Sequence, residues 1–504
     1  MGTGVPTSEL AYCQRIRALL ASRFPWSELL LFSLTAILFA VHRTEYQIDD
    51  AYITYRYAHN AAHGIGARYM EGDDACGYST PGFFLLLTAA EALGIPSHVA
   101  SPWIAAFAQC LAAVVLYRLF RQCSGPWAAG LAVLCVVVHS GWLWTGQNGM
   151  ETSLFVLCVL STVLRATSAS KHGVGAFLGA TVLLRFDGIV LAPALMFCSL
   201  NTGQKLREGV IAALIVSAWL VFSFSYYGDF LPTSVRAKLD YHDGRLIDCL
   251  MPFVLAIVCV PTLQSVLFGL IVIGIGVAVV RRDRWILCLL AFVVLQIAGF
   301  TLSRIHPFNW YVVPPTVTAT AIAGRGLAFV LESSRPKLLR WAITVSYLVF
   351  IGMLLVSSRS FLQDHGRSTA YRNRPYEQVT TWIRSNLEPG STILVGEVGY
   401  MGYLLLDYRV IDSSGINCRW IQRLRRQLMS ELKPSNKHER ENLEYCLLRD
   451  VIDVLRPDAF TGFVMMSGYA SLYHDAGFKK RYEIVHGPWE DLRQSRATMM
   501  AVRR

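Results

Sequence analysis

Two adjacent acids, Asp49 and Asp50, are the residues of this chain whose type and position best suit chemistry. They follow the first apolar run, Trp26 to Val41, and therefore stand close to the membrane surface if that run crosses a bilayer. Acids near a membrane are costly and commonly functional, and a carboxylate placed there can act as a general base. The structural alternative is that they complement a helix dipole, although one acid is enough for that. Arg56, a little further on, could orient an anion.

Glu151, Arg185 and Asp187 are further candidates, because each borders or interrupts an apolar segment. Glu151 belongs to Gly149–Leu154 and stands at the outer start of a predicted membrane helix, where it could contact substrate or complement the helix dipole. Arg185 and Asp187 interrupt a long apolar run. They could form a structural ion pair or face a polar cavity, and we favour the cavity because ionisable groups at such depth are commonly functional.

Basic residues on the predicted outer loops are candidates for binding a phosphate. Arg236 and Lys238 follow the loop that begins at Gly228, and they could contact a phosphate or only solvent. Arg304 and His306 lie at another outer helix junction. Arg304 is unusual, because the chain otherwise keeps its membrane-flanking basic residues on the inner side. We therefore take Arg304 as a candidate phosphate contact.

His59 and His63 share one predicted helix with the acidic pair, at a spacing that places both on one face. That spacing can bind zinc, but no HExxH glutamate accompanies the two histidines. We therefore assign no metal ligand and no certain cofactor, and a divalent cation stays an open option. Asp73 and Asp74, further along the chain, are typical of turns.

The composition decides which class of protein must position these residues. Of 504 residues, 54% are hydrophobic and 16% are charged, whereas a typical soluble protein has about 25% charged residues. The mean hydropathy is +0.40. These values argue against a soluble enzyme, a disordered protein and a nucleic-acid-binding protein. The net charge of +11 is typical of lysine and arginine on the cytoplasmic loops of a membrane protein, and many of the 12 cysteines lie in apolar runs as small buried hydrophobes.

Apolar runs predict about eleven membrane helices, at about 1.5 Å per residue against a hydrocarbon core of about 30 Å. With the N-terminus in the cytoplasm, nearly every membrane-flanking basic cluster lies inside and the acid-rich loops lie outside, as the positive-inside rule requires. Two shorter apolar stretches, 83–93 and 251–261, are more typical of re-entrant or interfacial segments. The predicted spans are 26–41, 100–120, 126–143, 151–166, 174–186, 188–200, 209–226, 263–281, 285–303, 312–331 and 341–357.

This topology divides the chain into two domains. Residues 1–357 form the transmembrane domain, and its first outer loop, residues 42–99, carries the acidic pair. Residues 358–504 are more polar, follow a helix that exits outward, and predict a small extracytoplasmic α/β domain. Cys418 and Cys446 lie in that domain, where a disulfide is permitted. Its predicted elements are strands at 391–396, 408–412 and 478–485 and helical structure over 419–456.

The segment DDAYITYRYAHNAAHGIGARYMEGDDACGYSTPGFFLLL, residues 49–87, resembles the first-loop signature of bacterial GT-C glycosyltransferases. It is most similar to the family of the terminal arabinofuranosyltransferase of the mycobacterial cell wall and its proteobacterial relatives. Later matches follow in the expected order, so the resemblance spans most of the chain. They are GMETSL at 149–154, RFDG at 185–188, GDFLPTSVRAK at 228–238 and GEVGYMGYLLLDYRVIDSSG at 396–415.

The resemblance implies a polytopic α-helical GT-C fold, a sugar donor on polyprenyl phosphate, and an extracytoplasmic glycan or lipid acceptor. Asp49 and Asp50 match the acidic motif of the family, and one of them, with Asp49 preferred, would deprotonate the acceptor hydroxyl. Arg56, Arg185 or Arg304 would neutralise the leaving lipid phosphate. The resemblance does not assign arabinose as the donor sugar. Further substrate contacts would come from Tyr78, Glu151, Asp187, Lys238 and His306.

Two other functions stay open at this point. A transporter or flippase of a lipid-linked or anionic solute would need paired acids or broken helices near the bilayer midplane, and commonly inverted halves. Here the acids lie at the outer edge and no internal repeat is visible. A non-catalytic GT-C-like envelope or motility factor would keep the fold, and loss of the acidic pair would favour it, whereas both acids are present. A glycosyltransferase of the bacterial plasma membrane is therefore the first hypothesis.

Overall fold

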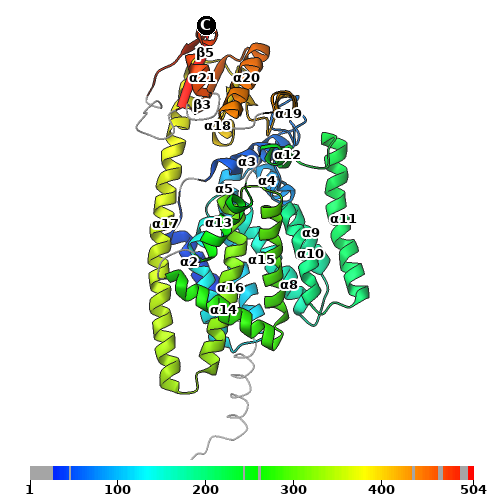
Figure 1. The fold of residues 1–504 in the computed structure, drawn as a ribbon, viewed down its shortest axis with the longest axis vertical. Helices are drawn as coiled ribbons and strands as arrows, with labels where there is room; N and C mark the ends of the chain where they lie inside the picture. Colours follow the sequence, from blue (N-terminus) through cyan, green and yellow to red (C-terminus); the bar gives the residue numbers. More distant parts are fainter. Residues whose placement is uncertain are drawn as a thin grey trace, which may run out of the picture.

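The computed structural model describes residues 26–44, 47–241, 245–258, 263–433, 437–463, 469–487 and 498–504. Figure 1 shows three layers from bottom to top: a bundle of apolar helices, a layer of shorter helices across its upper end, and a small α/β domain. We call residues 358–504 the tail. The tail comprises this α/β domain and the adjoining part of the long helix that leads to it. Arg15, Arg17 and Arg23, which precede the first apolar run, lie outside the described residues.

Most helices of the bundle coincide with predicted apolar runs, so a mostly helical fold with several apolar helices is confirmed, whereas the number of about eleven membrane helices stays a prediction. Those long and apolar enough to cross a membrane, by length and composition, are α5 (Ser97–Phe120), α11 (Thr202–Tyr227), α15 (Arg284–Leu302) and α17 (Lys337–Asn386). The other helices of the bundle are α2 (Trp26–Val41), α6 (Pro126–Val137), α8 (Thr152–Thr167), α9 (Val174–Leu184), α14 (Leu263–Arg281) and α16 (Asn309–Ser333).

Two predicted spans are interrupted in the structure. The run 126–143 divides into α6 and the short helix α7 (Ser140–Thr145). A continuous helix over 188–200 is wrong, because the chain there forms η1 (Phe186–Val190), α10 (Leu191–Ala194) and η2 (Leu195–Phe197). Gly188 and Pro193 explain this break, since glycine weakens a helix and proline removes a backbone donor.

The middle layer consists of short helices at the upper end of the bundle (Figure 1). The stretches predicted to be too short to span form α4 (Pro81–Ala92) and α13 (Leu246–Val258), of 12 and 13 residues. At about 1.5 Å per residue, each is about 20 Å long or less, which is shorter than a hydrocarbon core of about 30 Å. The layer also contains α3 (Asp49–Ala62) and α12 (Thr233–Tyr241).

The tail is carried by α17, which runs without a break from the lower end of the bundle to the α/β domain (Figure 1). The expected boundary at residues 357 and 358 therefore falls inside a helix of 50 residues. Five strands form a sheet in the order β2-β1-β3-β5-β4, in which β1 is parallel to β2 and β3 while β5 is antiparallel to β3 and β4. The strands are β1 (Thr392–Val395), β2 (Arg409–Asp412), β3 (Ala459–Phe463), β4 (Tyr482–Ile484) and β5 (Thr498–Arg503).

The tail elements agree with the sequence prediction in part. The first two predicted strands are confirmed as β1 and β2, whereas residues 478–485 form a helix end followed by the short strand β4. Cys418 and Cys446 are both free thiols. The tail helices are α18 (Tyr400–Leu404), α19 (Arg419–Leu432), α20 (Lys437–Leu455), α21 (Tyr469–His474) and α22 (Ala476–Arg481).

One apolar core joins the bundle to the lower face of the tail. Buried side chains of the tail, among them Val395, Met401 and Leu405, belong to the same cluster as the buried side chains of α3 and of the bundle. A second cluster lies on the other side of the sheet, between its strands and the helices α19 and α20. The tail is therefore packed onto the middle layer, and this packing positions the segment that meets the acidic pair.

Candidate functional site

Asp49 lies at the interface between the middle layer and the tail. It is the first residue of α3 and is only 5% exposed. Its Oδ1 accepts a hydrogen bond of 2.8 Å from the backbone N–H of Tyr400, and its Oδ2 accepts one of 3.2 Å from the N–H of Gly399. The carboxylate thus receives the N-terminal N–H groups of α18, from a segment that the sequence placed in a different domain.

Two glycines in the tail segment allow this close approach. A Cβ at Gly399 would overlap the backbone carbonyl of Asp49, and a Cβ at Gly402 would overlap the hydroxyl of Tyr69. Each substitution would therefore force α18 away from the first-loop segment, since interiors have no room for an extra methyl group. The tail motif that the sequence analysis matched to the family is thus a part of the tail that contacts the first loop.

The charge of Asp49 is influenced by a tail arginine that sequence reasoning missed. Burial raises the pKa of the Asp49 carboxyl from its usual value of 3.8, while the positive charge of Arg372 and the two backbone N–H groups oppose that shift. Arg372 lies on α17 and is half-buried, and its Nη2 is buried without a hydrogen-bond partner among the described residues. A buried guanidinium nitrogen beside a carboxylate is typical of a site that contacts an anion.

Asp50 faces a different direction from Asp49, because successive helical residues are rotated by about 100°. It is half-buried, so it is more accessible than Asp49. The two acids of the pair therefore have distinct environments: one is held by the tail, and the other is closer to solvent.

Arg56 holds the tail rather than facing a cavity. Its Nε donates to the carbonyl of Tyr69 at 2.8 Å, and its terminal nitrogens donate to the carbonyls of Gly402, Leu405 and Tyr408. The guanidinium is 3% exposed and lies over the ring of Tyr69. These bonds occupy most of the five donors of an arginine, so in this conformation Arg56 joins the two segments.

Arg185, Asp187 and Glu151 are brought together as an internal ion cluster. Arg185 donates to both carboxylate oxygens of Asp187, at 3.0 and 2.9 Å, and its Nη1 lies 3.9 Å from Glu151. The same Nη1 donates to the carbonyl of Trp310 at 2.9 Å, and Gln296 donates to Asp187 at 2.6 Å. Arg185 and Glu151 are each 2% exposed. The structural ion pair that the sequence left as the alternative is therefore present.

The remaining predicted residues lie in separate places. Tyr78 is buried, and its hydroxyl lies 3.1 Å from that of Tyr227. Arg304 and His306 are exposed in the link between α15 and α16, where Arg304 has a φ of 56°. Lys238 lies on α12, and its side chain is outside the described part of the structure.

An apolar cavity of about 490 Å³ opens among α7, α13, α14, α16 and α17. Its volume lies within the range of about 300–1,000 Å³ that is usual for ligand pockets. Trp144 and His365 line this cavity, and they also line a small neighbouring pocket with Ile48 and Gln147. Ile48 directly precedes Asp49, so the small pocket beside the cavity lies next to the acidic pair.

Gln147 lines the small pocket beside this cavity. It is 3% exposed, and neither its side-chain oxygen nor its nitrogen has a hydrogen-bond partner among the described residues. Buried amides are normally paired, so an unpaired amide beside a cavity indicates a position where a ligand or water is bound. Neither Gln147 nor His365 was singled out from the sequence, because nothing in their local pattern distinguishes them from structural polar residues.

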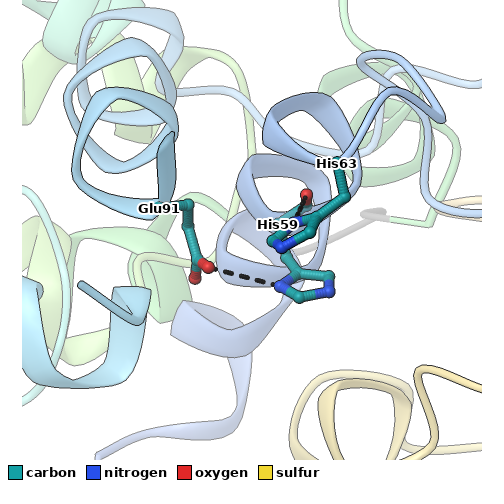
Figure 2. A group of neighbouring side chains, drawn as sticks. All are labelled: His59, His63 and Glu91. Carbon is teal, nitrogen blue, oxygen red and sulfur yellow. Dashed lines mark hydrogen bonds and ion pairs between the residues drawn. The ribbon is translucent and has the colours of Figure 1, made fainter. Parts of the chain in front are cut away.

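Glu91 lies beside His59 and His63, although the sequence analysis did not associate it with them. It belongs to α4, and the three side chains could hold a metal ion (Figure 2). Glu91 is far along the chain and stands in an apolar stretch, so no local spacing pattern indicated it.

The tail matches a known family in sequence, and the whole chain is similar in fold to solved structures. Residues 363–500 match the model of a family described as a domain of unknown function (DUF8728). No curated protein matches this chain in sequence.

Solved structures with a similar fold cover most of this chain. It is similar to ArnT from Cupriavidus metallidurans bound to undecaprenyl phosphate, with 12% identity and a TM-score of 0.61 over 94% of this chain and 97% of that chain. It is also similar to the oligosaccharyltransferase AglB from Archaeoglobus fulgidus in complex with an inhibitory peptide and a dolichol-phosphate. That likeness has 13% identity and a TM-score of 0.58 over 92% of this chain and 73% of that chain. These likenesses confirm the GT-C fold that the first-loop motif predicts.

Proposed function

We propose that this chain is a membrane glycosyltransferase that transfers a sugar from a polyprenyl-phosphate donor to a hydroxyl group of an extracytoplasmic glycan or lipid. The observation that carries this proposal is the apolar cavity together with the small pocket beside it, which shares Trp144 and His365 with the cavity and is lined by Ile48, the neighbour of Asp49. Structures of the same fold were solved with undecaprenyl phosphate and with a dolichol-phosphate, and both ligands combine an apolar chain with an anionic head. An apolar cavity with a small polar pocket beside it suits such a molecule.

In this proposal Asp49 is the general base. It accepts the proton of the acceptor hydroxyl as the oxygen attacks the anomeric carbon, and the bond from that carbon to the phosphate oxygen breaks. The raised pKa of Asp49 makes it a stronger base than an exposed carboxylate, and the two N–H groups from α18 fix its orientation. Asp50, which is more exposed, remains the other candidate for this role.

The leaving lipid phosphate needs positive charge, and the three predicted arginines differ in how they could supply it. Arg56 and Arg185 are occupied by bonds to backbone carbonyls and to carboxylates. We therefore assign the phosphate contact to the exposed Arg304 and add Arg372, which faces Asp49. Lys238, His306 and Tyr78 stay predictions as substrate contacts.

The finer predictions of the sequence belong to the same proposal. We expect the chain to lie in the bacterial plasma membrane with the tail on the extracytoplasmic side, where it covers the acceptor site. The resemblance to the arabinofuranosyltransferase family supports a cell-envelope glycan as acceptor. The donor sugar is not assigned.

A non-catalytic GT-C-like factor is the second candidate, because one observation favours it. Both oxygens of Asp49 already accept hydrogen bonds, and Arg56 and Arg185 serve internal contacts. A scaffold that uses the acidic motif to dock its tail would have this geometry.

A donor-consumption assay separates the two candidates. Purified full-length protein is given a panel of radiolabelled polyprenyl-phosphate sugars with a membrane glycan extract, beside Val313→Trp, which fills the cavity lined by Val313. We expect one donor to be consumed by the wild type and not by the filled variant. If no donor is consumed while the wild-type protein still complements a deletion strain, the non-catalytic factor is the better account.

A further inference from the structure

His59, His63 and Glu91 form a compact group at the far end of α3 from the acidic pair. The two histidines lie one helical turn apart on α3, and Glu91 reaches them from α4 (Figure 2). The atoms that could act as ligands all lie within 4.8 Å of one another. We propose that these three side chains bind a divalent cation of the zinc class, with water as the fourth ligand.

The contact between His59 and Glu91 already has the spacing of two ligands on one ion. Nδ1 of His59 lies 3.2 Å from Oε2 of Glu91. Ligand atoms at about 2.0–2.2 Å from a tetrahedral zinc are about 3.3 Å apart. An ion could therefore replace the direct contact with small rotations of the two side chains.

The hydrogen bond made by His63 presents its other ring nitrogen as a ligand. Nδ1 of His63 lies 2.8 Å from the carbonyl oxygen of His59. A carbonyl oxygen only accepts, so Nδ1 carries the proton and Nε2 carries the lone pair in the neutral ring. This is the arrangement common in metal sites, where the ring nitrogen that is not a ligand donates to a carbonyl or a carboxylate.

Glu91 is oriented by a similar outer contact. Its Oε1 accepts a hydrogen bond of 2.6 Å from the backbone N–H of Ser97, at the start of α5, while Oε2 points to His59. The residue is 8% exposed within an apolar helix, where burial of a negative charge is costly. A divalent cation would compensate this charge more strongly than a neutral imidazole.

The proposed metal site would fix the position of helices and would take no part in sugar transfer. His59 follows Asp49 by ten residues on α3, which is about 15 Å along the helix axis. An ion bound there would fix the end of α3 against α4 and the start of α5. The inference is independent of the proposed glycosyltransferase activity.

A simple ion pair between His59 and Glu91 is the competing account, and His63 distinguishes the two. The exposed His63 is no member of the ion pair, although its ring stacks on that of His59 at 4.0 Å, whereas it supplies one of three protein ligands to a metal. Because it is exposed, its replacement should leave the fold intact.

The test uses the purified full-length protein in detergent after removal of metal with EDTA. On addition of zinc alone, we expect the wild type to retain about one equivalent and to show a higher melting temperature. His63→Ala and Glu91→Gln should bind zinc at least about tenfold more weakly, since even loss of an outer contact costs about that much. His172→Ala, which replaces an exposed histidine on another loop, should behave like the wild type.

Two results would overturn the inference. One is a wild type that retains no zinc after exchange and shows no change in melting temperature. The other is zinc binding of equal strength in the wild type and His63→Ala. Cobalt(II) gives an independent check, because a tetrahedral site with nitrogen and oxygen ligands should give visible absorption in the wild type and not in His63→Ala.

Discussion

Asp49 and Arg185 are both buried ions, 5% and 2% exposed, but their charges are compensated in different ways. Arg185 is paired with carboxylates and carbonyls within the bundle. Asp49 accepts two hydrogen bonds from backbone N–H groups of the tail, and the positive charge of Arg372 acts on it. Arg185 therefore stabilises the bundle without the tail, whereas the hydrogen bonds and the pKa of Asp49 depend on whether the tail is docked.

This difference explains why only one of the two can do chemistry in the proposed account. An arginine shared by two carboxylates has little charge left for a phosphate. A carboxylate held by backbone dipoles keeps lone pairs for a proton, and burial raises its pKa. The comparison predicts that changes at Asp49 affect transfer and that changes at Arg185 affect stability.

The largest expected effect is on catalysis. Asp49→Asn removes the proposed base, so the rate of sugar transfer should fall by about 10²–10⁴-fold, the usual contribution of a general base. The change keeps the shape of the side chain, but the amide nitrogen cannot accept one of the two backbone N–H bonds, so a loss of stability of about 1 kcal/mol is expected beside the much larger loss of rate. Transfer kinetics with a saturating donor measure the effect. Unchanged kinetics in a folded Asp49→Asn protein would remove Asp49 from the catalytic role.

The next effect concerns stability. Arg185→Met leaves the buried Glu151 and the partly exposed Asp187 without their cation, and breaking a buried pair costs about 3–5 kcal/mol. The matched control is Arg118→Met, because Arg118 makes a similar two-bond contact with Glu28 but is mostly exposed. The control should cost less than about 1 kcal/mol. Thermal melting in detergent compares the two, and equal losses would contradict the view that Arg185 holds the bundle.

A smaller effect is expected from moving the tail. Gly399→Ala places a methyl group against the carbonyl of Asp49, and overpacking of this kind costs about 1–3 kcal/mol. Gly352→Ala, on α17 and with open space around it, is the control. Limited proteolysis should release the tail faster from Gly399→Ala only. If both variants resist equally, the close contact between α18 and α3 does not hold the tail.

The smallest effect is a shift in pH dependence. The pKa of Asp49 is raised, so transfer should be lost as the pH falls through a value above 3.8, where the base becomes protonated. Arg372 opposes that shift, and Arg372→Gln should move the acid limb of the pH–rate profile to higher pH by up to about one unit. Arg374→Gln changes an exposed arginine on the same helix and should leave the limb in place. A shift to lower pH would contradict the sign of this interaction.

Much of the fold could be predicted from the sequence, because membrane helices follow directly from apolar run length. The exceptions have local causes. Gly188 and Pro193 break one run into short pieces, and α17 continues into the polar tail because backbone hydrogen bonds do not require an apolar sequence.

The candidate site could be predicted only in part. Asp49, Arg56 and Arg185 could be selected from their residue types. Most of their contact partners lie far away in the sequence, and no sequence pattern links a residue to its partner. Gly399 and Gly402 carried a signal that could have been used, since two glycines at a three-residue spacing permit close approach of another segment. Arg372 and Glu91 carried no such signal, because a single charged residue on a helix is most often solvated or paired.

The most direct measurement is sugar transfer by Asp49→Asn and Asp50→Asn side by side, with the donor that the wild type consumes. Tail docking is checked in the same samples by limited proteolysis. The account predicts that Asp49→Asn is folded, retains its docked tail and fails to transfer, while Asp50→Asn keeps most of its activity. A folded Asp49→Asn protein that transfers sugar at the wild-type rate would contradict the central claim.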